Sequence, residues 1–455
     1  MPQGEPVCRR FSRRLFAPAA LLALAAVLSA LEEAPRYLPS AAPDRIVANW
    51  TESPATSFSV TWRTSAAVAR AFAEIAEAAD GPDFDKDARR VQAATERYET
   101  NLGPAHAHSV TFRDLKPAAE YVYRVGDGKD SWTEWIPFRT AAATPEPFTF
   151  LSVGDAQTRI LAVWPRLLRR AFETAPDARF IIHAGDLINN HDRDEQWGEW
   201  HEASSWLHRT VAALPVPGNH EYGRGGDGNR RLTVNWRPQF TLPRNGVEGL
   251  EETCYFLDFQ GVRLVALNSN EKQKEQAEWL DRLLTNNPNR WTVVFFHHPI
   301  YSGARQRDNR ELRELWQPVF DRHGVDLVLN GHDHVYARTG LVRGDGKREG
   351  GTVYVVSVSG AKMYGLQKRP EFVRLVGRMQ MFQVVRVRGG TLSFEARTAR
   401  GVLVDQFDLV KEGAAKRLVE KQAQPGQPGS TDAAQKNRAS ELAARPEGGL
   451  PGCDI

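Results

Sequence analysis

The chain has little cysteine, and its cysteines form no motif. Only three occur among its 455 residues, Cys8, Cys254 and Cys453, and they lie far apart in the sequence. This spacing excludes a CxxC motif and a disulfide framework. Because Cys254 lies in the apolar run TCYFLDF, we expect it to be a small buried residue. The lack of paired thiolates also disfavours a structural zinc cage.

The sequence also lacks a strong excess of charge of either sign. Its formal net charge is +3, with 25% charged and 41% hydrophobic residues. Such a balance predicts no steering toward polyanions, and we expect no nucleic-acid-binding module. The composition is that of a globular protein, and the length allows two or three domains. The sequence leaves the oligomeric state open.

Only one apolar stretch approaches the ~18 to 20 residues that a membrane span needs. It occupies residues 15–31 and follows arginines at positions 9, 10, 13 and 14. This order predicts a signal peptide and linker over residues 1–42, and export to the periplasm or the exterior. The segment SRRLF at residues 12–16 resembles the twin-arginine export signature. A general secretory signal and an uncleaved N-terminal membrane anchor are the alternatives, and only the anchor implies membrane contact.

Residues 43–141 are predicted to be all-β. Phe58, Val60 and Trp62 alternate with polar residues, which is the period of a half-buried strand. Further on, Tyr121 and Tyr123 share one strand face after a turn, a spacing that resembles fibronectin type III domains with their corner tyrosine. The region contains no cluster of metal-type ligands. We expect a packing platform, with substrate gating or partner contact as the alternative.

A second domain is predicted over residues 147–410, after a short linker. Here apolar runs of five to eight residues alternate with helical periodicity, which indicates an α/β core. One helical face is carried by Trp164, Leu167, Leu168, Ala171 and Phe172. Residues 411–455 are rich in Gln, Gly, Pro and Ala, so we expect a disordered tail.

Five apolar runs of this second domain end in acidic, amide or histidine side chains. The runs are FTFLSVGD, FIIHAGD, LPVPGNH, VVFFHH and LVLNGHDH, and their final ligand-type residues are Asp155, Asp186, Asn219 with His220, His297, and His332 with His334. In an α/β sheet, functional groups collect outside the carboxyl ends of the strands. The five runs therefore predict one cluster at a sheet edge. His183, His201, His208 and His323 do not share this placement and are expected to be structural.

Carboxylate, amide and imidazole ligands suit iron, manganese or zinc, and leave all three open. The ligand count is too high for one tetrahedral ion. Two ions ~3.5 to 4 Å apart that share one carboxylate can clamp the attacking and leaving oxygens of a phosphoryl displacement. The sequence therefore predicts a cofactor of two divalent or trivalent metal ions.

The motifs GDAQ, GDLIN, GNHE, FFHHP and GHDH closely resemble the motif series of calcineurin-like metallophosphoesterases. With the β-domain in front and the segment CYFLDFQGVRLVALNS, the chain resembles the purple acid phosphatase family over residues 43–410. The resemblance implies a fibronectin type III-like domain followed by an α/β metallophosphoesterase domain, a four-layer αββα sandwich. It also implies an exported phosphatase that hydrolyses small phosphate monoesters by in-line attack of a metal-bound hydroxide.

The resemblance also assigns roles. Asp186 is expected to bridge the two ions. Asp155 and His334 would hold the first ion, and Asn219, His297 and His332 the second. His220 would face the substrate phosphate and assist the leaving group, with His298 and Tyr301 as further substrate contacts.

Two positions depart from the family pattern. Asn189 stands where purple acid phosphatases carry the tyrosine that binds ferric iron and gives the colour, so a purple site is not expected. Gln157 stands where many relatives have a histidine. We predict that Gln157 supplies an amide oxygen to the first ion, although a loop residue that bonds to the backbone is the alternative.

Two other functions stay open. A phosphodiesterase or nucleotide-cleaving enzyme would use the same ligands, and the long Gly-rich segment at residues 222–252 would then shape the site. A non-catalytic surface module that binds a partner through the β-domain is the other alternative. The loss of a shared ligand would favour this module, but no ligand is lost.

Overall fold

The computed structural model describes residues 36–413 and 415–421. The predicted export signal and residues 422–455 of the predicted tail lie outside the described residues. From Pro39 onward, the described residues belong to one compact unit. No helix within the described ranges has the length and apolar character needed to cross a membrane.

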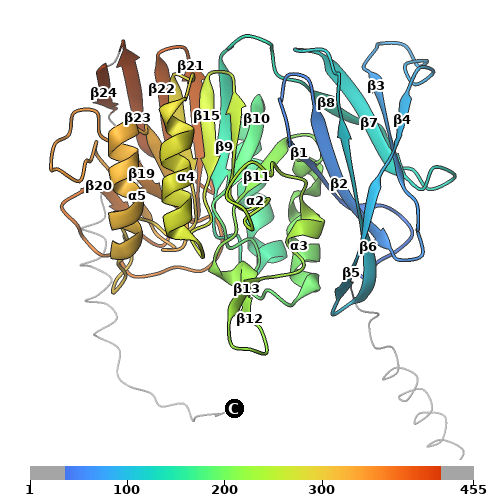
Figure 1. The fold of residues 1–455 in the computed structure, drawn as a ribbon, viewed down its shortest axis with the longest axis horizontal. Coiled ribbons are helices and arrows are strands. Elements are labelled where there is room, and N and C mark those ends of the chain that lie inside the picture. Colours follow the sequence, from blue (N-terminus) through green and yellow to red (C-terminus); the bar gives the residue numbers. More distant parts are fainter. Residues whose placement is uncertain (1–35, 414, 422–455) are drawn as a thin grey trace, which may run out of the picture. The chain divides into compact units, whose positions relative to one another are not determined.

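The first domain is a sandwich of two four-stranded antiparallel sheets, as predicted (Figure 1). One sheet has the order β1-β2-β6-β5 and the other β4-β3-β7-β8. The strands are β1 Asp44–Asn49, β2 Phe58–Ser65, β3 Phe72–Glu77, β4 Arg89–Gln92, β5 Ala94–Thr100, β6 Gly103–Phe112, β7 Glu120–Gly126 and β8 Ile136–Arg139. The corner tyrosine is Tyr121, whose hydroxyl accepts a hydrogen bond of 2.8 Å from the backbone N–H of Lys116.

Strand β2 is more buried than its alternating sequence predicts. Phe58, Val60 and Trp62 fill the sandwich core, but the polar residues between them are also buried. The polar face lies against the second domain, where the Thr61 and Thr241 hydroxyls are 2.5 Å apart. The alternation therefore marks two different buried faces, one apolar and one hydrogen-bonded.

The second domain contains two seven-stranded mixed sheets. The first has the order β11-β10-β9-β21-β22-β23-β24 and the second β14-β15-β16-β17-β19-β18-β20. Their strands are β9 Phe148–Val153, β10 Ala178–His183, β11 Ala212–Pro215, β14 Tyr255–Phe259, β15 Val262–Ala266, β16 Trp291–Phe295, β17 Leu327–Asn330, β18 Tyr336–Thr339, β19 Val353–Val356, β20 Phe372–Val376, β21 Met381–Arg388, β22 Thr391–Thr398, β23 Leu403–Glu412 and β24 Ala415–Glu420.

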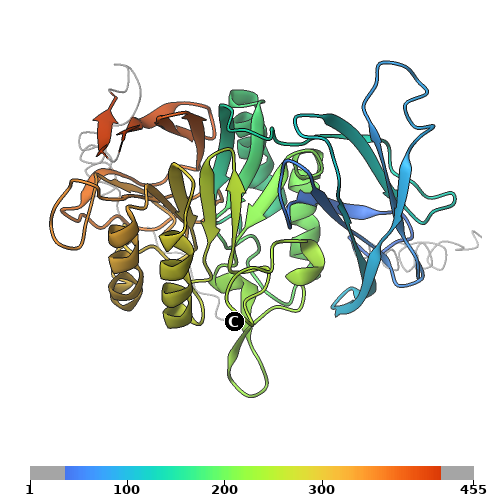
Figure 2. The ribbon, with the colours of Figure 1, turned by 45° about the horizontal axis from the view of Figure 1, so that its top comes forward.

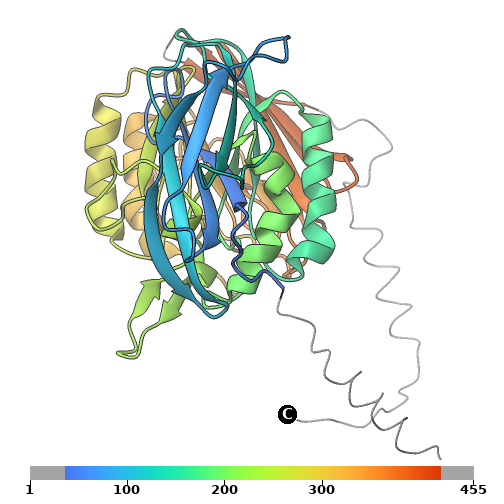
Figure 3. The same ribbon diagram turned by 90° about the vertical axis from the view of Figure 1, so that its right-hand side faces the viewer.

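Helices cover both outer faces of the paired sheets. Figure 3 shows α4 and α5 on one side and α2 and α3 on the other, with the strands between them. The helices are α2 Ile160–Thr174, α3 Asp194–His208, α4 Gln273–Thr285 and α5 Arg310–His323. Between the sheets, Phe150 and Phe180 of the first sheet and Phe295 of the second belong to one buried cluster. The predicted four-layer αββα arrangement is therefore confirmed.

The helical periodicity predicted for α2 is also confirmed. Trp164, Leu167, Leu168 and Ala171 are buried on one face, and Phe172 is partly buried at its margin. Burying such a face contributes roughly 1.5 to 3 kcal/mol for each large apolar side chain. This packing holds α2 against the first sheet, close to the turn that follows β9.

The first sheet extends beyond the predicted boundary at residue 410. Strand β23 continues to Glu412, and β24 pairs with it in antiparallel register. The buried residue of β24 is Lys416, whose Nζ lies 3.1 Å from Asp326 Oδ1. The prediction of disorder from residue 411 was wrong for this strand. Its burial depends on an ion pair, which a composition averaged over the Gln- and Gly-rich tail does not reveal.

Residues 222–252, predicted to be an irregular loop, contain a hairpin and a short helix. Strands β12 Tyr222–Arg224 and β13 Arg230–Leu232 pair in antiparallel register, and the 3-10 helix η2 spans Arg237–Gln239. Figures 1 and 2 show the hairpin projecting beyond the ends of the sheets. It begins directly after the 3-10 helix η1 Asn219–Glu221, so it starts at the predicted ligand cluster.

The two domains are joined by hydrogen bonds and by aromatic packing. Asn49 Nδ2 of β1 donates to the Ala213 carbonyl of β11 at 2.6 Å. The Trp50 ring lies 6.1 Å from Phe180 and 5.3 Å from Phe259, measured between ring centroids. The sandwich therefore packs directly on the sheets that carry the predicted ligands.

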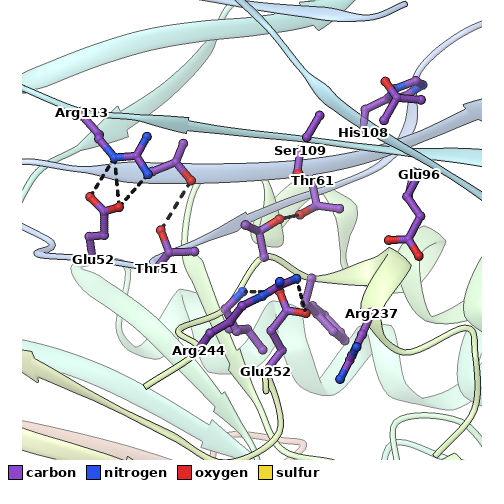
Figure 4. A pocket seen from close by; sticks show the side chains of 17 residues that line it. Thr51, Glu52, Thr61, Glu96, His108, Ser109, Arg113, Arg237, Arg244 and Glu252 are labelled. Carbon is purple, nitrogen blue, oxygen red and sulfur yellow. Dashed lines mark hydrogen bonds and ion pairs between the residues drawn. The ribbon is translucent and has the colours of Figure 1, made fainter. Parts of the chain in front are cut away.

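A cavity of about 440 Å³ lies in this seam, between β2, β5, β6 and residues 237–252 (Figure 4). The Arg113 guanidinium binds the Glu52 carboxylate at 2.6 Å, and Arg244 lies 3.3 Å from Glu252. None of the predicted ligands lines this cavity. It is therefore separate from the predicted metal site.

Candidate metal centre

The predicted ligands follow the carboxyl ends of strands in both sheets. Asp155 follows β9 and Asp186 follows β10, in the first sheet, and Asn219 comes after the neighbouring β11. His297 follows β16 and His332 follows β17, in the second sheet. Because β9, β10 and β11 are mutually parallel, their ligands meet at one edge. The predicted placement at strand ends is confirmed.

Four of these residues have a left-handed backbone, which is uncommon outside glycine. The φ angles are 54° at Asp155, 51° at Asp186, 71° at His332 and 52° at His334. Each such conformation costs on the order of 1 kcal/mol and persists only where the surrounding structure imposes it. The turns direct all four side chains into one space.

The side chains converge to within a few ångströms. His297 Nε2 lies 3.3 Å from Asp186 Oδ2, 3.1 Å from Asn219 Oδ1 and 3.1 Å from His332 Nδ1. Ligand atoms of Asp155, Asp186 and His297 all lie within 4.8 Å of one another. His297 Nε2 therefore lies beside the other two side chains predicted for the second ion and beside the shared Asp186.

The residues predicted for the first ion adjoin this group. His334 Nε2 lies 3.4 Å from Asp155 Oδ1. Gln157 Nε2 lies 2.7 Å from Asp186 Oδ2 and 3.1 Å from His334 Nε2. Gln157 thus turns its amide nitrogen toward the cluster, while its buried oxygen Oε1 has no hydrogen-bond partner. An exchange of these two amide positions would present the oxygen to a cation.

Three histidines bind backbone carbonyls through Nδ1. The Nδ1 of His297 lies 2.9 Å from the Ala184 carbonyl, that of His334 2.8 Å from the Lys362 carbonyl, and that of His220 2.5 Å from the Asn189 carbonyl. A carbonyl only accepts, so each Nδ1 carries a proton, and whenever the ring is neutral its lone pair is on Nε2. Metal-binding histidines are usually oriented in this way.

Burial and neighbouring charges shift the pKa values of the two carboxyl groups and of His297 in the cluster. Burial raises the pKa of Asp155 well above its usual value. Burial also acts to raise the pKa of Asp186, but the neighbouring His297 outweighs it and lowers that pKa. At His297, burial acts to lower the pKa, and the attraction of Asp186 outweighs it and raises the pKa to about 9.

The other two histidines of the cluster remain bases. Burial lowers the pKa of His334 to about 4, and burial together with the charge of His297 lowers the pKa of His332. Two buried carboxylates, the imidazoles of His332 and His334, and the amide oxygen of Asn219 beside His297 form a donor set that suits cations. The residues present therefore fit the predicted metal ions.

Glu221 is a residue of this site that the sequence analysis missed. Its buried carboxylate accepts four backbone hydrogen bonds, of 3.0 Å from Asp186, 2.8 Å from Leu187, 3.1 Å from Ile188 and 2.6 Å from Gly218. It therefore fastens the turn of Asp186 to the turn of the GNHE motif. The signal was the glutamate that ends this motif, although its partners lie far away in the sequence.

Two glycines leave room for the carboxylates. A Cβ on Gly218 would lie 2.1 Å from Asp186 Oδ1, and a Cβ on Gly331 would lie 2.5 Å from Asp155 Oδ2. Real Cβ atoms do not approach other atoms so closely. The glycines of GNHE and GHDH therefore allow the chain to pass directly beside Asp186 and Asp155.

The predicted substrate contacts are placed differently from one another. His220 is partly exposed, with Nε2 3.9 Å from Asp186 Oδ2. His298 binds Ser269 Oγ through Nδ1 at 2.8 Å, and its ring lies 4.3 Å from that of His332. Both rings therefore adjoin the cluster.

Tyr301 does not reach the cluster. It is buried in an apolar core with Tyr354, and its hydroxyl accepts a hydrogen bond of 2.8 Å from Gln317 of α5. The prediction of a substrate contact at Tyr301 was wrong, because the chain turns after His298 and directs this ring under α5. His183, which ends β10, and His201 and His208 of α3 are buried, as expected of structural residues.

Cationic side chains surround the cluster, and the sequence analysis missed them. Arg230 of β13 donates to the Asn219 carbonyl at 2.8 Å. Arg307 donates to the His332 carbonyl at 2.8 Å. Arg230 lies 11 residues after Asn219 and Arg307 lies 25 residues before His332, outside the ligand motifs, so the fold is needed to show that they reach the ligands.

Comparison with known proteins identifies two family domains in this chain. Residues 43–140 match the N-terminal domain of purple acid phosphatases, and residues 148–336 match the calcineurin-like phosphoesterase domain. Purple acid phosphatase 1 of Ipomoea batatas is 25% identical over 257 residues, which cover 52% of this chain and 53% of that protein. The chain spans about half the length of the curated relatives it matches.

Further relatives add information on metals and fold. The Fe(3+)-Zn(2+) purple acid phosphatase 12 of Arabidopsis thaliana is 23% identical over 276 residues, covering 56% of this chain and 57% of that protein. A solved purple acid phosphatase from yellow lupin seeds superposes with a TM-score of 0.70 at 18% identity, covering 82% of this chain and 75% of that chain. At such identity the structural likeness shows the fold alone.

Proposed function

We propose that this chain, whose two domains match the N-terminal domain of purple acid phosphatases and the calcineurin-like phosphoesterase domain, hydrolyses phosphate monoesters at the cluster around Asp186. One observation carries the proposal. The six ligand-type side chains predicted from strand ends converge, and a partly exposed histidine, His220, stands beside them. A site that only stabilised the fold would not need an accessible imidazole.

Two cations are proposed to occupy the cluster. Asp155 and His334 would hold one, Asn219, His297 and His332 the other, and Asp186 would be shared. Bound there, they would polarise the phosphate and lower the pKa of water. Iron, manganese and zinc all suit these donors. Because Asn189 replaces the iron-binding tyrosine, we propose a site without the purple absorption band.

The remaining side chains have separate tasks. His220 has its Nδ1–H on the Asn189 carbonyl, so Nε2 is the atom that faces the ester oxygen. In the imidazolium form Nε2 also carries a proton, which it would transfer to the leaving group, and the ring would return to the neutral Nδ1–H form. Burial lowers the pKa of His298 to about 3, so this ring is neutral near pH 7 and binds substrate without charge. Arg230 and Arg307 place positive charge where an anionic phosphate approaches.

The experiment compares four proteins with p-nitrophenyl phosphate and bis(p-nitrophenyl) phosphate. We expect the native protein to hydrolyse the monoester faster, and Asp186→Asn to abolish this activity. Asp281→Asn, which changes an exposed carboxylate on α4, is the matched control and should match the native protein. His220→Ala should lower kcat by about 100-fold, in the range of a lost general acid.

Two results would contradict the proposal. Full monoester activity in Asp186→Asn would place the reaction elsewhere. A higher kcat/KM for the diester would favour the phosphodiesterase alternative.

We also propose that the protein is exported. The basic and apolar order of residues 9–31 supports this proposal, and the SRRLF segment favours the twin-arginine route. Fractionation of bacterial cells that express the full chain should find it outside the cytoplasm, and Arg13→Lys with Arg14→Lys should retain it inside. Unchanged export of that double variant would reject the twin-arginine route. Native protein confined to the cytoplasm would reject export itself.

A further inference from the structure

Residues of the β-sandwich bind the N-terminal end of α3. Arg45 of β1 binds Asp194 with both terminal guanidinium nitrogens, Nη1 at 2.7 Å to Oδ1 and Nη2 at 2.8 Å to Oδ2. Arg63 of β2 adds a contact of 3.1 Å to Oδ2. The Asp194 side chain is 0% exposed, and those of Arg45 and Arg63 are 3% and 2% exposed. Charge-assisted bonds in such a setting are among the stronger protein contacts.

The turn between β5 and β6 holds the same helix end. Asn101 Oδ1 accepts from the backbone N–H of Asp194 at 2.8 Å, and Asn101 Nδ2 donates to the Glu195 carboxylate at 2.8 Å. The first turn of α3 is thus fixed by residues of three sandwich strands or turns. No candidate ligand takes part in these contacts.

The same helical turn holds the peptide unit beside His220. Gln196 Oε1 accepts hydrogen bonds from the backbone N–H of Asn189, at 2.8 Å, and of Asn190, at 2.9 Å. The Asn190 N–H and the Asn189 carbonyl belong to one planar peptide unit and point in opposite directions. Gln196 therefore fixes the direction of the Asn189 carbonyl, and this carbonyl accepts the Nδ1–H of His220 at 2.5 Å.

We propose that the β-sandwich positions His220 for catalysis, and that Arg45, Asp194 and Gln196 are its positioning residues. The contacts run from Arg45 to Asp194, along one helical turn to Gln196, and through the Asn189 peptide to the imidazole. They hold Nδ1–H on the Asn189 carbonyl, so that Nε2 faces the substrate and is the nitrogen that gains and releases the transferred proton. The inference rests on the proposed function, because it assigns His220 the proton transfer.

Substitutions of Gln196 test the proposal most directly. Gln196→Ala removes the acceptor of two N–H groups, so we expect kcat to fall about tenfold, the effect of roughly one lost hydrogen bond, with KM and metal content unchanged. Gln196→Glu keeps an oxygen at the same place and should restore kcat to within about twofold of the native value. Gln317→Ala, in which a glutamine of α5 loses its bond to a core tyrosine, is the matched control and should retain the native kcat.

A double-mutant cycle tests the route through His220. If Gln196 acts through this ring, Gln196→Ala should change kcat by less than about twofold once His220 is already alanine. A tenfold loss in both backgrounds would overturn the inference, since Gln196 would then act without His220.

The Arg45→Met variant tests whether the β-sandwich contributes to the position of His220. This variant leaves Arg63 on Asp194, so we expect a smaller fall in kcat of about threefold. Arg124→Met is the control, because Arg124 pairs with Glu74 inside the sandwich and does not contact α3. Equal kcat for Arg45→Met and the native protein would remove the sandwich from the proposal.

A spectroscopic readout separates positioning from general stability. In metal-free protein, at a pH at which the ring is neutral, the imidazole ¹⁵N shifts of His220, assigned by difference with His220→Ala, should show one protonated nitrogen, Nδ1. In Gln196→Ala the two shifts should move toward each other as both tautomers become populated, and in Gln196→Glu they should not. Identical spectra in all three proteins would contradict the inference. Activity that survives Asp186→Asn would instead reject the proposed function, so the two failures are distinguishable.

Discussion

Replacing Asp194 by asparagine tests the strength of the contact between the domains. Asparagine keeps one oxygen, which can bind Arg45 Nη1, but turns an NH2 group toward Arg45 Nη2 and Arg63 Nη1, now 2.8 and 3.1 Å from Asp194 Oδ2. Two charge-assisted bonds are lost, each of about 1.5 to 3 kcal/mol. The buried guanidinium of Arg45 also loses its charged partner, whereas Arg63 keeps Asp44. We expect the free energy of unfolding to fall by about 3 to 5 kcal/mol.

Urea unfolding followed by circular dichroism and by tryptophan fluorescence measures this change. Asp44→Asn is the matched control, because Asp44 also binds Arg63 but its side chain is 40% exposed. Water can replace the lost bonds there, so about 1 kcal/mol or less is expected. A loss below about 1 kcal/mol for Asp194→Asn, or equal losses for the two variants, would refute the reasoning, since burial would then carry no penalty.

Two other predictions concern pH and metal retention. Burial lowers the pKa of His183 to about 3, and lowers the pKa values of His201 and His208 well below the usual value. The unfolded chain therefore binds more protons than the folded chain below about pH 6.5. The free energy of unfolding should be highest above that pH and fall toward pH 3, by up to about 4 kcal/mol per pH unit for three groups. Urea midpoints that stay constant from pH 7 to 4 would contradict this prediction. Gly331→Ala places a Cβ 2.5 Å from Asp155 Oδ2 and should reduce bound metal by about half or more, as mass spectrometry of the metal content can measure, whereas Gly344→Ala, with no atom nearer than 3.3 Å, should retain it.

The ligands could be predicted from the sequence because each one is marked locally. Asp155, Asp186 and His332 each follow an apolar run and a glycine, and the carboxyl ends of parallel strands meet at one edge. The order of these runs was enough to predict the cluster and the α/β layers. The same three residues have left-handed φ angles in the structure, which agrees with a sharp turn after each apolar run.

The residues that hold the ligands in place could not be predicted. Glu221 is bonded to backbone N–H groups more than thirty residues earlier, and Asn101 to α3 more than ninety residues later, so neither contact leaves a pattern in a window of sequence. Tyr301 was misplaced for a related reason. A motif gives the position along the chain, but the direction of a side chain depends on the turn that follows. Strand β24 was missed because an ion pair of Lys416 replaces the apolar face that periodicity detects.

The structure also shows which part of the second domain the β-sandwich binds. From sequence alone it was a packing platform without ligands of its own. Its buried arginines instead bind the helix that follows the Asp186 turn. Under the proposed positioning of His220, the same contacts would serve packing and function, and substitutions in the sandwich are expected to change catalysis and stability together.

The most direct test of the central claim is a crystal structure of the purified protein with anomalous scattering data collected at the iron, manganese and zinc edges. Two anomalous peaks are predicted, ~3.5 to 4 Å apart, with a carboxylate oxygen of Asp186 within ligand distance of both. One peak should lie beside Asp155 and His334, and the other beside Asn219, His297 and His332. A single peak, no peak, or a pair of peaks that Asp186 does not bridge would contradict the account.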